Sequence, residues 1–429
     1  MDILVIGAGH VGLVTGACFA ELGNKVICVD DDAQKIQGLE RGVLPFYEPG
    51  LEEMVHRNMK RARLSFTISV EEGTKASDII FIAVGTSQKP DGEADLTSVE
   101  AVSQRIAKAM DGYKLIVEKS TVPVKTGNWI GKTIKLNNTH NIDFDVASNP
   151  EFLREGSAIE DFMKPDRIVI GVEMERAASI MTELYSPLNA PIILTNIETA
   201  ELIKHASNAF LALKLSYINA IANICEKVGA DVIKVAEGMG CDKRIGREFL
   251  NAGIGYGGYC LPKDLSAFIK VAEEGGYDFE LLKIVQKIND FQRQQIVRKA
   301  KDVIWNLKGK TIGVLGLSFK PNTDDMREAP SIDIITQLQE EGVRIKAYDP
   351  QAMNNARRII HDIEYCHNPY EVAKDSDALV VITEWEEFKK LDLVRIKQLL
   401  KQLVIIDGRN IFDPAEMKAL GFSYIGVGR

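Results

Sequence analysis

The sequence predicts an α/β protein with two doubly wound lobes, each built on a parallel sheet, joined by a long central helix and a helical domain. Short apolar runs alternate with helical patterns over residues 1–196, and the same alternation returns over 306–429. Between them, residues 197–305 carry helical patterns. We therefore expect three domains, 1–196, 197–305 and 306–429.

The first lobe begins with one βαβ unit. The run 2–6, DILVI, is typical of a parallel strand buried on both faces. A helical pattern over 11–22 ends at Gly23, a residue suited to a helix C-terminus. Residues 25–29 predict the next strand. Further strands are predicted at 78–84, 114–118, 144–148 and 167–171.

One long helix is predicted from Thr199 to about Val228, because this stretch contains neither Gly nor Pro. It is longer than a small domain needs, so we expect a spine between lobes or an oligomer interface, and hence a homodimer or a larger homo-oligomer. The second lobe then follows. Its predicted strands are 310–319, 344–348, 378–383 and 403–407, with a helix at 331–341.

Composition excludes several classes of protein. The 429 residues include 52 Lys and Arg against 61 Asp and Glu, a net charge of −9. An acidic total argues against nucleic-acid and polybasic membrane partners. No apolar run approaches the roughly 18 residues of a membrane span. Six cysteines without a CxxC pair look like reduced thiols, and the first residues lack a signal-peptide pattern, so we expect a cytoplasmic protein.

The strongest local motif is Gly7-x-Gly9-x-x-Gly12 between the first strand and helix. In that context it predicts a Rossmann-like dinucleotide site with the pyrophosphate at the helix N-terminus. Asp30, at the end of the second strand, suits a ribose 2′-hydroxyl and would repel a 2′-phosphate, so we expect NAD rather than NADP. In the second lobe, the shorter pattern 313–316 fits a structural turn and a site for a different nucleotide equally well.

Cys260 differs from the other cysteines by its surroundings. Three of the residues 255–258 are glycines, which allow the backbone to approach a ligand closely. Lys263 is near enough in sequence to favour the thiolate. Most cysteines are small buried hydrophobes. For Cys260 a nucleophile is at least as probable as that interpretation.

Lys204 and Asn208 lie four residues apart on one face of the long helix. Lys204 either extends to water past apolar neighbours or stabilises an oxyanion. The segment Asn149–Gly156 predicts a helix start, with Asn149 as N-cap and a proline next. Glu151 and Glu155 are then either an exposed acidic face or acid–base and hydroxyl-binding groups.

Long motifs in this order carry a resemblance that covers essentially the whole chain. The chain resembles the UDP-glucose/GDP-mannose dehydrogenase family, and NPEFLREG, CDKRIG and FLNAG look most like its UDP-glucose branch. The motifs are GAGHVG (7–12), ADLTSVE (94–100), KSTVPVKTG (119–127), SNPEFLREGSAIEDFMKPDRIVIG (148–171), CDKRIGREFLNAGIGYGGYCLPKD (241–264), GLSFKPNTDDMRE (316–328) and DGRN (407–410).

This resemblance implies a four-electron oxidation of UDP-glucose to UDP-glucuronate with two NAD⁺, a step in polysaccharide biosynthesis. The first oxidation gives an aldehyde, to which Cys260 adds as a thiohemiacetal. A second hydride loss gives a thioester, which water hydrolyses. The nucleophile makes the aldehyde carbon tetrahedral, so that it can lose another hydride, and it keeps the aldehyde bound.

The resemblance also implies roles for single residues, and no metal. The catalytic residues are Cys260, Lys204 and Asn208 for the oxyanions, Asp264 and Thr121 for a proton-relaying water, and Glu155 as base in thioester hydrolysis. NAD contacts are Gly7, Gly9, Val11, Gly12, Asp30, Lys35, Thr86, Thr121, Glu155, Lys263 and Arg327. Substrate contacts are Glu151, Phe152, Leu153, Arg154, Glu155, Lys204, Asn208, Arg244 (across a subunit interface), Phe249, Leu250, Asn251, Ala252, Gly253, Gly257, Lys320 and Arg409.

Two departures and three alternatives accompany the resemblance. Ser87 replaces a usual proline, and Asn251 stands where lysine is frequent, within the sugar-binding segment. The alternatives are oxidation of GDP-mannose or a UDP-N-acetylamino sugar, a two-electron hydroxyacid dehydrogenase, and a non-enzymatic NAD-binding regulator. The last two give no reason for Cys260.

Overall fold

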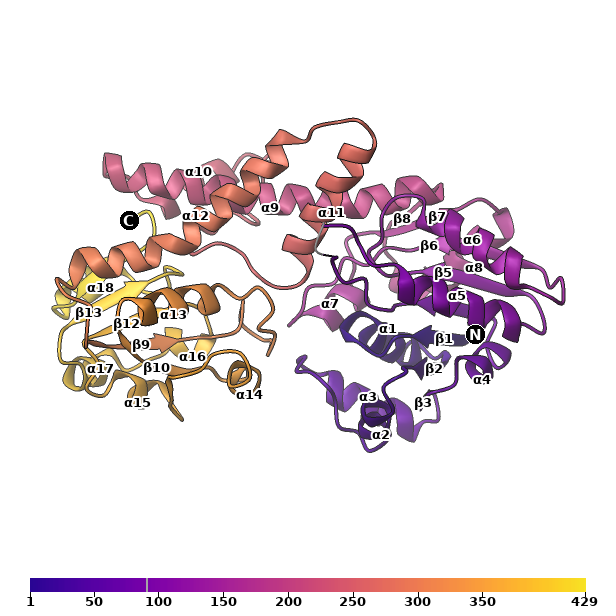
Figure 1. The fold of residues 1–429 in the computed structure, drawn as a ribbon, viewed down its shortest axis with the longest axis horizontal. Coiled ribbons are helices and arrows are strands. Elements are labelled where there is room, and N and C mark those ends of the chain that lie inside the picture. The colour runs from indigo at the N-terminus through magenta and orange to yellow at the C-terminus, as the bar shows by residue number, and fades with distance from the viewer. Residues whose placement is uncertain (90–91) are drawn as a thin grey trace. The chain divides into compact units, whose positions relative to one another are not determined.

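Figure 1 shows a computed structural model of the chain, which describes residues 1–89 and 92–429. The chain divides into two compact units, which are treated separately below. Unit 1 comprises Met1–Ser207 and Ser266–Tyr277, and unit 2 comprises Asn208–Leu265 and Asp278–Arg429. Two helices contribute to both units: α9 (Ile197–Val228) and α11 (Cys260–Glu274).

Unit 1 is built on a sheet of order β3-β2-β1-β4-β5-β6-β7-β8 within the described residues. Neighbouring strands are parallel except β6 and β7, which are antiparallel. The fold class predicted for this lobe is confirmed, with this one reversed pair added. The strands are β1 (Asp2–Ile6), β2 (Lys25–Val29), β3 (Leu64–Thr67), β4 (Ile79–Ile82), β5 (Lys114–Glu118), β6 (Phe144–Ser148), β7 (Ile168–Val172) and β8 (Ile192–Thr195).

Both faces of this sheet are covered by helices, which explains why the middle residues of its central strands are apolar. In β1, Ile3 and Val5 pack with α1, α3, α7 and α8, whereas Leu4 and Ile6 pack with α4, α5 and α6. All four side chains are at most 3% exposed. The helices are α1 (His10–Glu21), α2 (Ala33–Glu40), α3 (Leu51–Lys60), α4 (Val70–Lys75), α5 (Thr97–Ala109), α6 (Thr126–Asn137), α7 (Ala158–Met163) and α8 (Glu175–Tyr185).

Unit 2 contains a second, wholly parallel sheet of order β11-β10-β9-β12-β13-β14 within the described residues. This confirms the second α/β lobe. The strands, orange to yellow in Figure 1, are β9 (Thr311–Leu315), β10 (Arg344–Tyr348), β11 (Glu364–Tyr365), β12 (Ala378–Val381), β13 (Val404–Asp407) and β14 (Ser423–Ile425).

The helical segments of unit 2 pack directly on this second sheet. Val314 and Val380 share one apolar cluster with Ala222 of α9 and Ile296 of α12, while Leu379 belongs to a cluster on the other face. The core of unit 2 is therefore continuous from the central helices to the sheet. The helices are α10 (Val232–Gly240), α12 (Glu280–Val303), α13 (Pro330–Glu340), α14 (Met353–Ala356), α15 (Pro369–Ala373), α16 (Glu386–Lys389), α17 (Leu393–Leu399) and α18 (Pro414–Ala419).

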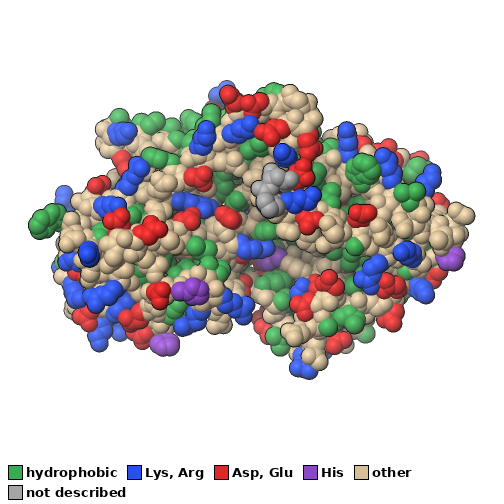
Figure 2. Space-filling view, in the orientation of Figure 1, with side chains coloured by type: hydrophobic (Ala, Val, Ile, Leu, Met, Phe, Trp, Pro, Cys, Tyr) green, Lys and Arg blue, Asp and Glu red, His purple; other side chains and the backbone are tan. Residues whose placement is uncertain are grey.

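The surface carries charges of both signs. On the face shown in Figure 2, Lys and Arg side chains are interspersed with Asp and Glu side chains. Within residues 1–89 and 92–429, we find no helix that is long and apolar enough to cross a membrane.

Candidate active site

The glycine-rich turn of unit 1 follows β1 and opens α1. Gly7 has a left-handed φ of +103°, and its N–H donates to Val29 O at 2.7 Å. A Cβ on Gly12 would lie 1.7 Å from Gly7 O, so glycine is needed for α1 to pack this closely. A Cβ on Gly9 would meet no heavy atom within 4 Å, which indicates open space at the turn. The arrangement suits a phosphate group at the start of α1.

Asp30 follows β2 and contacts this turn. Its Oδ2 accepts hydrogen bonds from Ala8 N–H at 2.8 Å and from Lys35 Nζ at 2.7 Å. Burial opposes ionisation, but these donors and the Asp32 N–H hold the pKa of the Asp30 carboxyl below its usual range. A carboxylate beside a phosphate-binding turn fits NAD, and its negative charge disfavours the 2′-phosphate of NADP.

Thr86 and Thr121 follow the neighbouring strands β4 and β5. Thr86 Oγ1 donates a hydrogen bond to Thr121 O at 2.9 Å, and Thr86 is buried. Because β1, β4 and β5 are parallel neighbours, both threonines and Val11 of α1 lie at the same edge of the sheet as the glycine-rich turn. The structure therefore brings these three predicted contacts to the predicted NAD site.

Glu151 and Lys204 form a buried ion pair in unit 1. Lys204 Nζ lies 2.9 Å from Glu151 Oε1, and the two side chains are each 4% exposed. The second oxygen, Oε2, accepts from Leu153 N–H at 2.6 Å. Two cations lie near the Phe152 ring, with Arg167 at 3.6 Å and Lys204 at 5.5 Å from its centre. Glu151 is therefore not part of an exposed acidic face.

The prediction that a helix starts at Asn149 is wrong. Residues 149–154 are in no helix, and α7 begins at Ala158. The Asn149 side chain does not cap a helix, because it donates to Val169 O at 2.8 Å and accepts from Lys119 Nζ at 2.9 Å. These bonds come from residues distant in sequence, which outweigh the local capping preference.

Arg154 and Glu155 follow next in the chain, and Glu155 begins the turn before α7. The Arg154 guanidinium donates to the Asp161 carboxylate, at 2.6 Å for the shortest contact. Just beyond Glu155, two backbone N–H groups donate to the buried Glu48 carboxylate at 2.7 and 2.8 Å. Glu48 therefore fixes the chain on the C-terminal side of Glu155.

In unit 2, Cys260 is the first residue of α11 and is half-buried. The N-terminus of α11, where Cys260 lies, carries the partial positive charge of the helix dipole. One turn later, Lys263 Nζ lies 2.7 Å from Asp264 Oδ1, and Asn208 Nδ2 donates to Asp264 Oδ2 at 2.6 Å. Asp264 is 1% exposed. The structure thus joins Asn208, Lys263 and Asp264 by direct contacts.

The glycine-rich loop before α11 is held by α12. Asn289 Oδ1 accepts from Tyr256 N–H at 2.8 Å, and its Nδ2 donates to Tyr256 O at 3.1 Å. Arg293 donates to the same carbonyl at 2.8 Å. A Cβ on Gly257 would lie 2.1 Å from Glu328 O. The loop is therefore fixed before it reaches the cysteine.

The segment Phe249–Gly253 begins at a left-handed residue, φ +62°. Leu250 and Ala252 are buried in the core of unit 2, whereas Asn251 is exposed. The last N–H of the segment donates to Asn219 Oδ1 at 2.8 Å. Leu250 and Ala252 therefore support the segment, and the Asn251 side chain is its exposed part.

The predicted substrate arginines have different surroundings. Arg409 Nε donates to Ile382 O at 2.7 Å, and its Nη1 lies 3.2 Å from where a Cβ on Gly253 would be. Glycine at position 253 thus leaves room for this arginine. The Arg244 side chain is 89% exposed and pairs with Asp242 at 2.6 Å.

Lys320 and Arg327 lie beside aromatic rings. Lys320 Nζ is 5.5 Å from the Phe319 ring centre, and the Arg327 guanidinium is 4.3 Å from that of Tyr259. Arg327 also pairs with Asp325 at 2.6 Å. Arg327 is therefore next to the glycine-rich loop that precedes Cys260.

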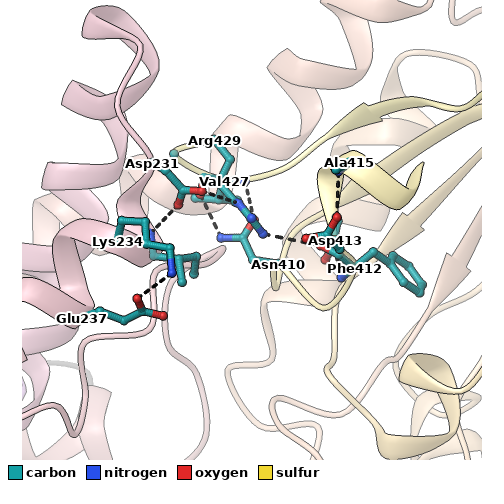
Figure 3. A network of polar contacts seen from close by, with 12 residues as sticks. Asp231, Lys234, Glu237, Asn410, Phe412, Asp413, Ala415, Val427 and Arg429 are labelled. Carbon is teal, nitrogen blue, oxygen red and sulfur yellow. Dashed lines mark hydrogen bonds and ion pairs between the residues drawn. The ribbon is translucent and has the colours of Figure 1, made fainter. Parts of the chain in front are cut away.

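A polar network next to Arg409 is shown in Figure 3. Asn410 Nδ2 donates to Val427 O, and Val427 N–H donates to Asn410 Oδ1, both at 2.9 Å. Arg429 Nε in turn lies 3.3 Å from Asp231 Oδ2 at the start of α10. The network ties the turn after β13 to the central helices of unit 2.

Comparisons with known proteins agree over the whole chain. Residues 1–189, 198–291 and 313–414 match the NAD binding, central and UDP binding domains of the UDP-glucose/GDP-mannose dehydrogenase family. The chain belongs to this family. It is 53% identical to UDP-glucose 6-dehydrogenase TuaD of Bacillus subtilis, over 100% of this chain and 93% of that protein. It is 48% identical to a UDP-glucose 6-dehydrogenase of Rhizobium meliloti, over the full length of both.

Solved structures of the family agree with this fold. A UDP-glucose dehydrogenase from the archaeon Pyrobaculum islandicum has a TM-score of 0.93 at 40% identity, covering 99% of this chain and 97% of its own. UDP-D-ManNAc dehydrogenase from Pyrococcus horikoshii has a TM-score of 0.87 at 28% identity, covering 100% and 99%. As a member of this family, the chain is an NAD-dependent dehydrogenase.

Several residues that support this dehydrogenase site were missed by sequence reasoning. They include Glu48, Lys119 and Asn289, which are polar residues buried in the fold. One feature could have pointed to them, namely a polar residue on an otherwise apolar helix face, such as Asn289 in α12. Such a residue is expected to have a hydrogen-bond partner inside the fold. Throughout the described parts of the chain, no group of three or more His, Cys, Asp or Glu could hold a metal ion.

Proposed function

We propose that this chain oxidises UDP-glucose to UDP-glucuronate, the reaction for which its relatives are named. UDP-glucose, water and two NAD⁺ give UDP-glucuronic acid, two NADH and two H⁺. Relatives named UDP-glucose 6-dehydrogenase, one of them as putative, support this substrate. They are 41–53% identical to this chain over its full length. The single observation that carries the four-electron reaction is Cys260, which begins α11 after a rigid glycine-rich loop and belongs to the same helix as the buried Asp264.

The residues of the first lobe fit NAD, which supplies a hydride acceptor when bound. We assign Gly7, Gly9 and Gly12 to the pyrophosphate, because their turn is open and ends at the start of α1. The Asp30 carboxylate would accept hydrogen bonds from a ribose. The remaining contacts that we propose are Val11, Lys35, Thr86, Thr121, Glu155, Lys263 and Arg327.

The nucleophile is the Cys260 thiolate. After the first oxidation, its sulfur forms a bond to the aldehyde carbon, and the carbonyl electron pair moves to oxygen as an oxyanion. That oxyanion collapses as the carbon loses a second hydride, leaving a thioester. Water then attacks the thioester carbon, and the C–S bond breaks to return the thiolate.

The charged residues have distinct roles in these steps. Lys204 stabilises the oxyanions with Asn208, which lies one turn further along α9. Asp264 and Thr121 hold a water that relays protons, and Glu155 takes a proton from the water that attacks the thioester. Glu151 holds the buried Lys204 in place through their 2.9 Å contact.

The substrate contacts are proposed from the same motifs. The segment Phe249–Gly253, Gly257 and Lys320 would contact the nucleotide sugar, with Arg409 at the end of β13. Glu151–Glu155, Lys204 and Asn208 would contact the sugar hydroxyls. Arg244 is exposed, which fits a contact to a substrate bound by a second subunit.

Assembly and location are part of the proposal. Phe210, Tyr217 and Ile224 of α9 are 60%, 48% and 54% exposed and recur every seven residues. Such a stripe supports a homodimer, because two copies could bury it against each other.

None of the six cysteines forms a disulfide, which supports a reducing, cytoplasmic location. We retain the three-domain division at residues 196 and 305.

The stoichiometry of NADH tests the reaction. A panel of UDP-glucose, GDP-mannose and UDP-N-acetylamino sugars is incubated with NAD⁺, and NADH formed is counted per sugar consumed. We expect UDP-glucose to be preferred, with two NADH per sugar. One NADH per sugar would identify a two-electron dehydrogenase, and preference for another sugar would correct the substrate.

Substitutions of the cysteine test the covalent step. The Cys260→Ala variant should fold and bind NAD⁺ but turn over negligibly, whereas Cys260→Ser should stall as a sugar ester, since esters hydrolyse more slowly than thioesters. Intact-protein mass spectrometry after addition of UDP-glucose and NAD⁺ detects the adduct. Cys241→Ser, at an exposed thiol, is the matched control. Near-normal turnover of Cys260→Ala at two NADH per sugar would exclude the covalent mechanism.

A further inference from the structure

A buried lysine follows β5 in unit 1 and has no role in the mechanism above. Lys119 is 4% exposed. Its Nζ donates to Asn149 Oδ1 at 2.9 Å, to Asn149 O at 3.3 Å and to Tyr185 OH at 3.4 Å. Burying an ammonium group away from water costs free energy. A lysine at this buried position therefore needs a reason beyond packing.

Asn149 is the residue on which this lysine acts. Its N–H donates to Glu118 O at 2.8 Å and its Nδ2 donates to Val169 O at 2.8 Å. The Tyr185 hydroxyl also donates to Asn149 Oδ1. Asn149 is thus bound to β5, β7 and α8 at once, and Lys119 is the charged member of this set.

Two residues further along, Glu151 is held in the same way. Its Oε1 lies 2.9 Å from Lys204 Nζ, and its Oε2 accepts from Leu153 N–H. Only one proline separates Asn149 from Glu151, so fixing Asn149 also fixes the backbone that carries the Glu151 carboxylate. Burial lowers the pKa of Lys119 to about 8, which Glu151 opposes and Lys204 reinforces, so these three charges interact.

We propose that Lys119 is a positioning residue for the oxidation: it fixes the turn Asn149–Glu151 and so places the carboxylate that holds Lys204. Without Lys119 the turn would be free to move, the Glu151 carboxylate would hold Lys204 less firmly, and Lys204 would stabilise an oxyanion less well. This inference rests on the role of Lys204 in the proposed function.

The test compares Lys119→Met with a matched buried lysine. Lys114 is the first residue of β5, the strand that Lys119 follows; it is 3% exposed and pairs with Asp111 at the opposite end of the strand from the site. We expect Lys119→Met to lower kcat about 10- to 100-fold with the KM of both substrates within about threefold. Lys114→Met should change kcat less than about twofold. It should lower the thermal midpoint by about as much as Lys119→Met does. A kcat of Lys119→Met within about twofold of the unmodified enzyme would overturn the proposal.

A double variant distinguishes positioning from an independent effect. If Lys119 acts through Lys204, adding Lys119→Met to Lys204→Met should lower kcat no further. Multiplicative losses would overturn the inference, as would normal kcat in Lys204→Met. The NADH yield per UDP-glucose of the unmodified enzyme tests the proposed function separately.

A second substitution applies if Lys119→Met does not fold. Tyr185→Phe keeps the ring and removes the hydroxyl that bonds to Asn149. We expect kcat to fall about fivefold at unchanged KM, as for one lost hydrogen bond. An unchanged kcat would overturn the proposal.

Discussion

A buried carboxyl at the end of β5 should make the stability of unit 1 depend on pH, and Glu118→Gln should remove that dependence. Glu118 is 1% exposed. Burial raises the pKa of Glu118 to about 8, the hydrogen bonds from Ser120 oppose the rise, and the nearby Glu201 adds to it. The folded protein therefore holds this carboxyl protonated where the unfolded chain ionises it.

The direction and size follow from proton linkage. A pKa raised from 4.5 to about 8 stabilises the fold fully below pH 4.5, and that contribution is lost as pH rises to about 8. Between pH 5 and pH 8 the loss is at most roughly 3 to 4 kcal/mol. If unit 1 unfolds as one body of about 220 residues, this lowers its thermal midpoint by roughly 7 to 14 °C.

Glu118→Gln replaces a protonated acid by a neutral group of the same shape. We expect similar stability of variant and parent at pH 5, and a clear advantage of the variant at pH 8. The assay is thermal unfolding followed by fluorescence from pH 5 to 9, with the exposed Glu53→Gln as control for the charge change. Equal pH slopes in the parent and in Glu118→Gln would show that burial does not keep Glu118 neutral.

Three further predictions concern other parts of the chain. The parent should have a much higher kcat/KM with NAD⁺ than with NADP⁺, and Asp30→Ala should reduce this ratio. Comparable kcat/KM values for the two cofactors in the parent would contradict the role of Asp30. Phe210→Glu should place charges in the proposed dimer face, so light scattering should report monomers; a monomeric parent would refute the interface. Glu48→Ala should leave the N–H groups of Gly156 and Ala158 without their acceptor and lower the urea-unfolding free energy by roughly 3 kcal/mol. A loss below about 1 kcal/mol would mean that water replaces the carboxylate.

The sequence predicts several interior strands well because each contains apolar residues that are buried in the core. The expected strands 114–118 and 144–148 coincide with β5 and β6, and 344–348 coincides with β10. By contrast, β3 and β8 were not predicted. Both lie at the edges of the sheet, are four residues long and are partly exposed, so they lack a continuous apolar run.

A candidate site can be predicted from the sequence where one short motif contains the residues that it needs. The glycine-rich turn and Asp30 are close in sequence, and the structure shows them in contact. The supporting residues could not be found in this way, because they act on distant segments. Glu48 binds the chain more than 100 residues later, and Asn289 binds the loop more than 30 residues earlier. Only folding shows that these pairs meet.

The reversed strand β7 explains why local reasoning failed at Asn149. In the sheet of unit 1, the predicted NAD contacts follow the carboxyl ends of parallel strands, as is usual for such folds. Since β7 is antiparallel to β6, with Ser148 paired to Gly171, the residues at the start of β7 lie beside those that follow β6. There Val169 O takes the Asn149 amide, and Arg167 covers the Phe152 ring at 3.6 Å. A parallel β7 would place its first residues at the other end of β6, and Asn149 would then be available to cap a helix.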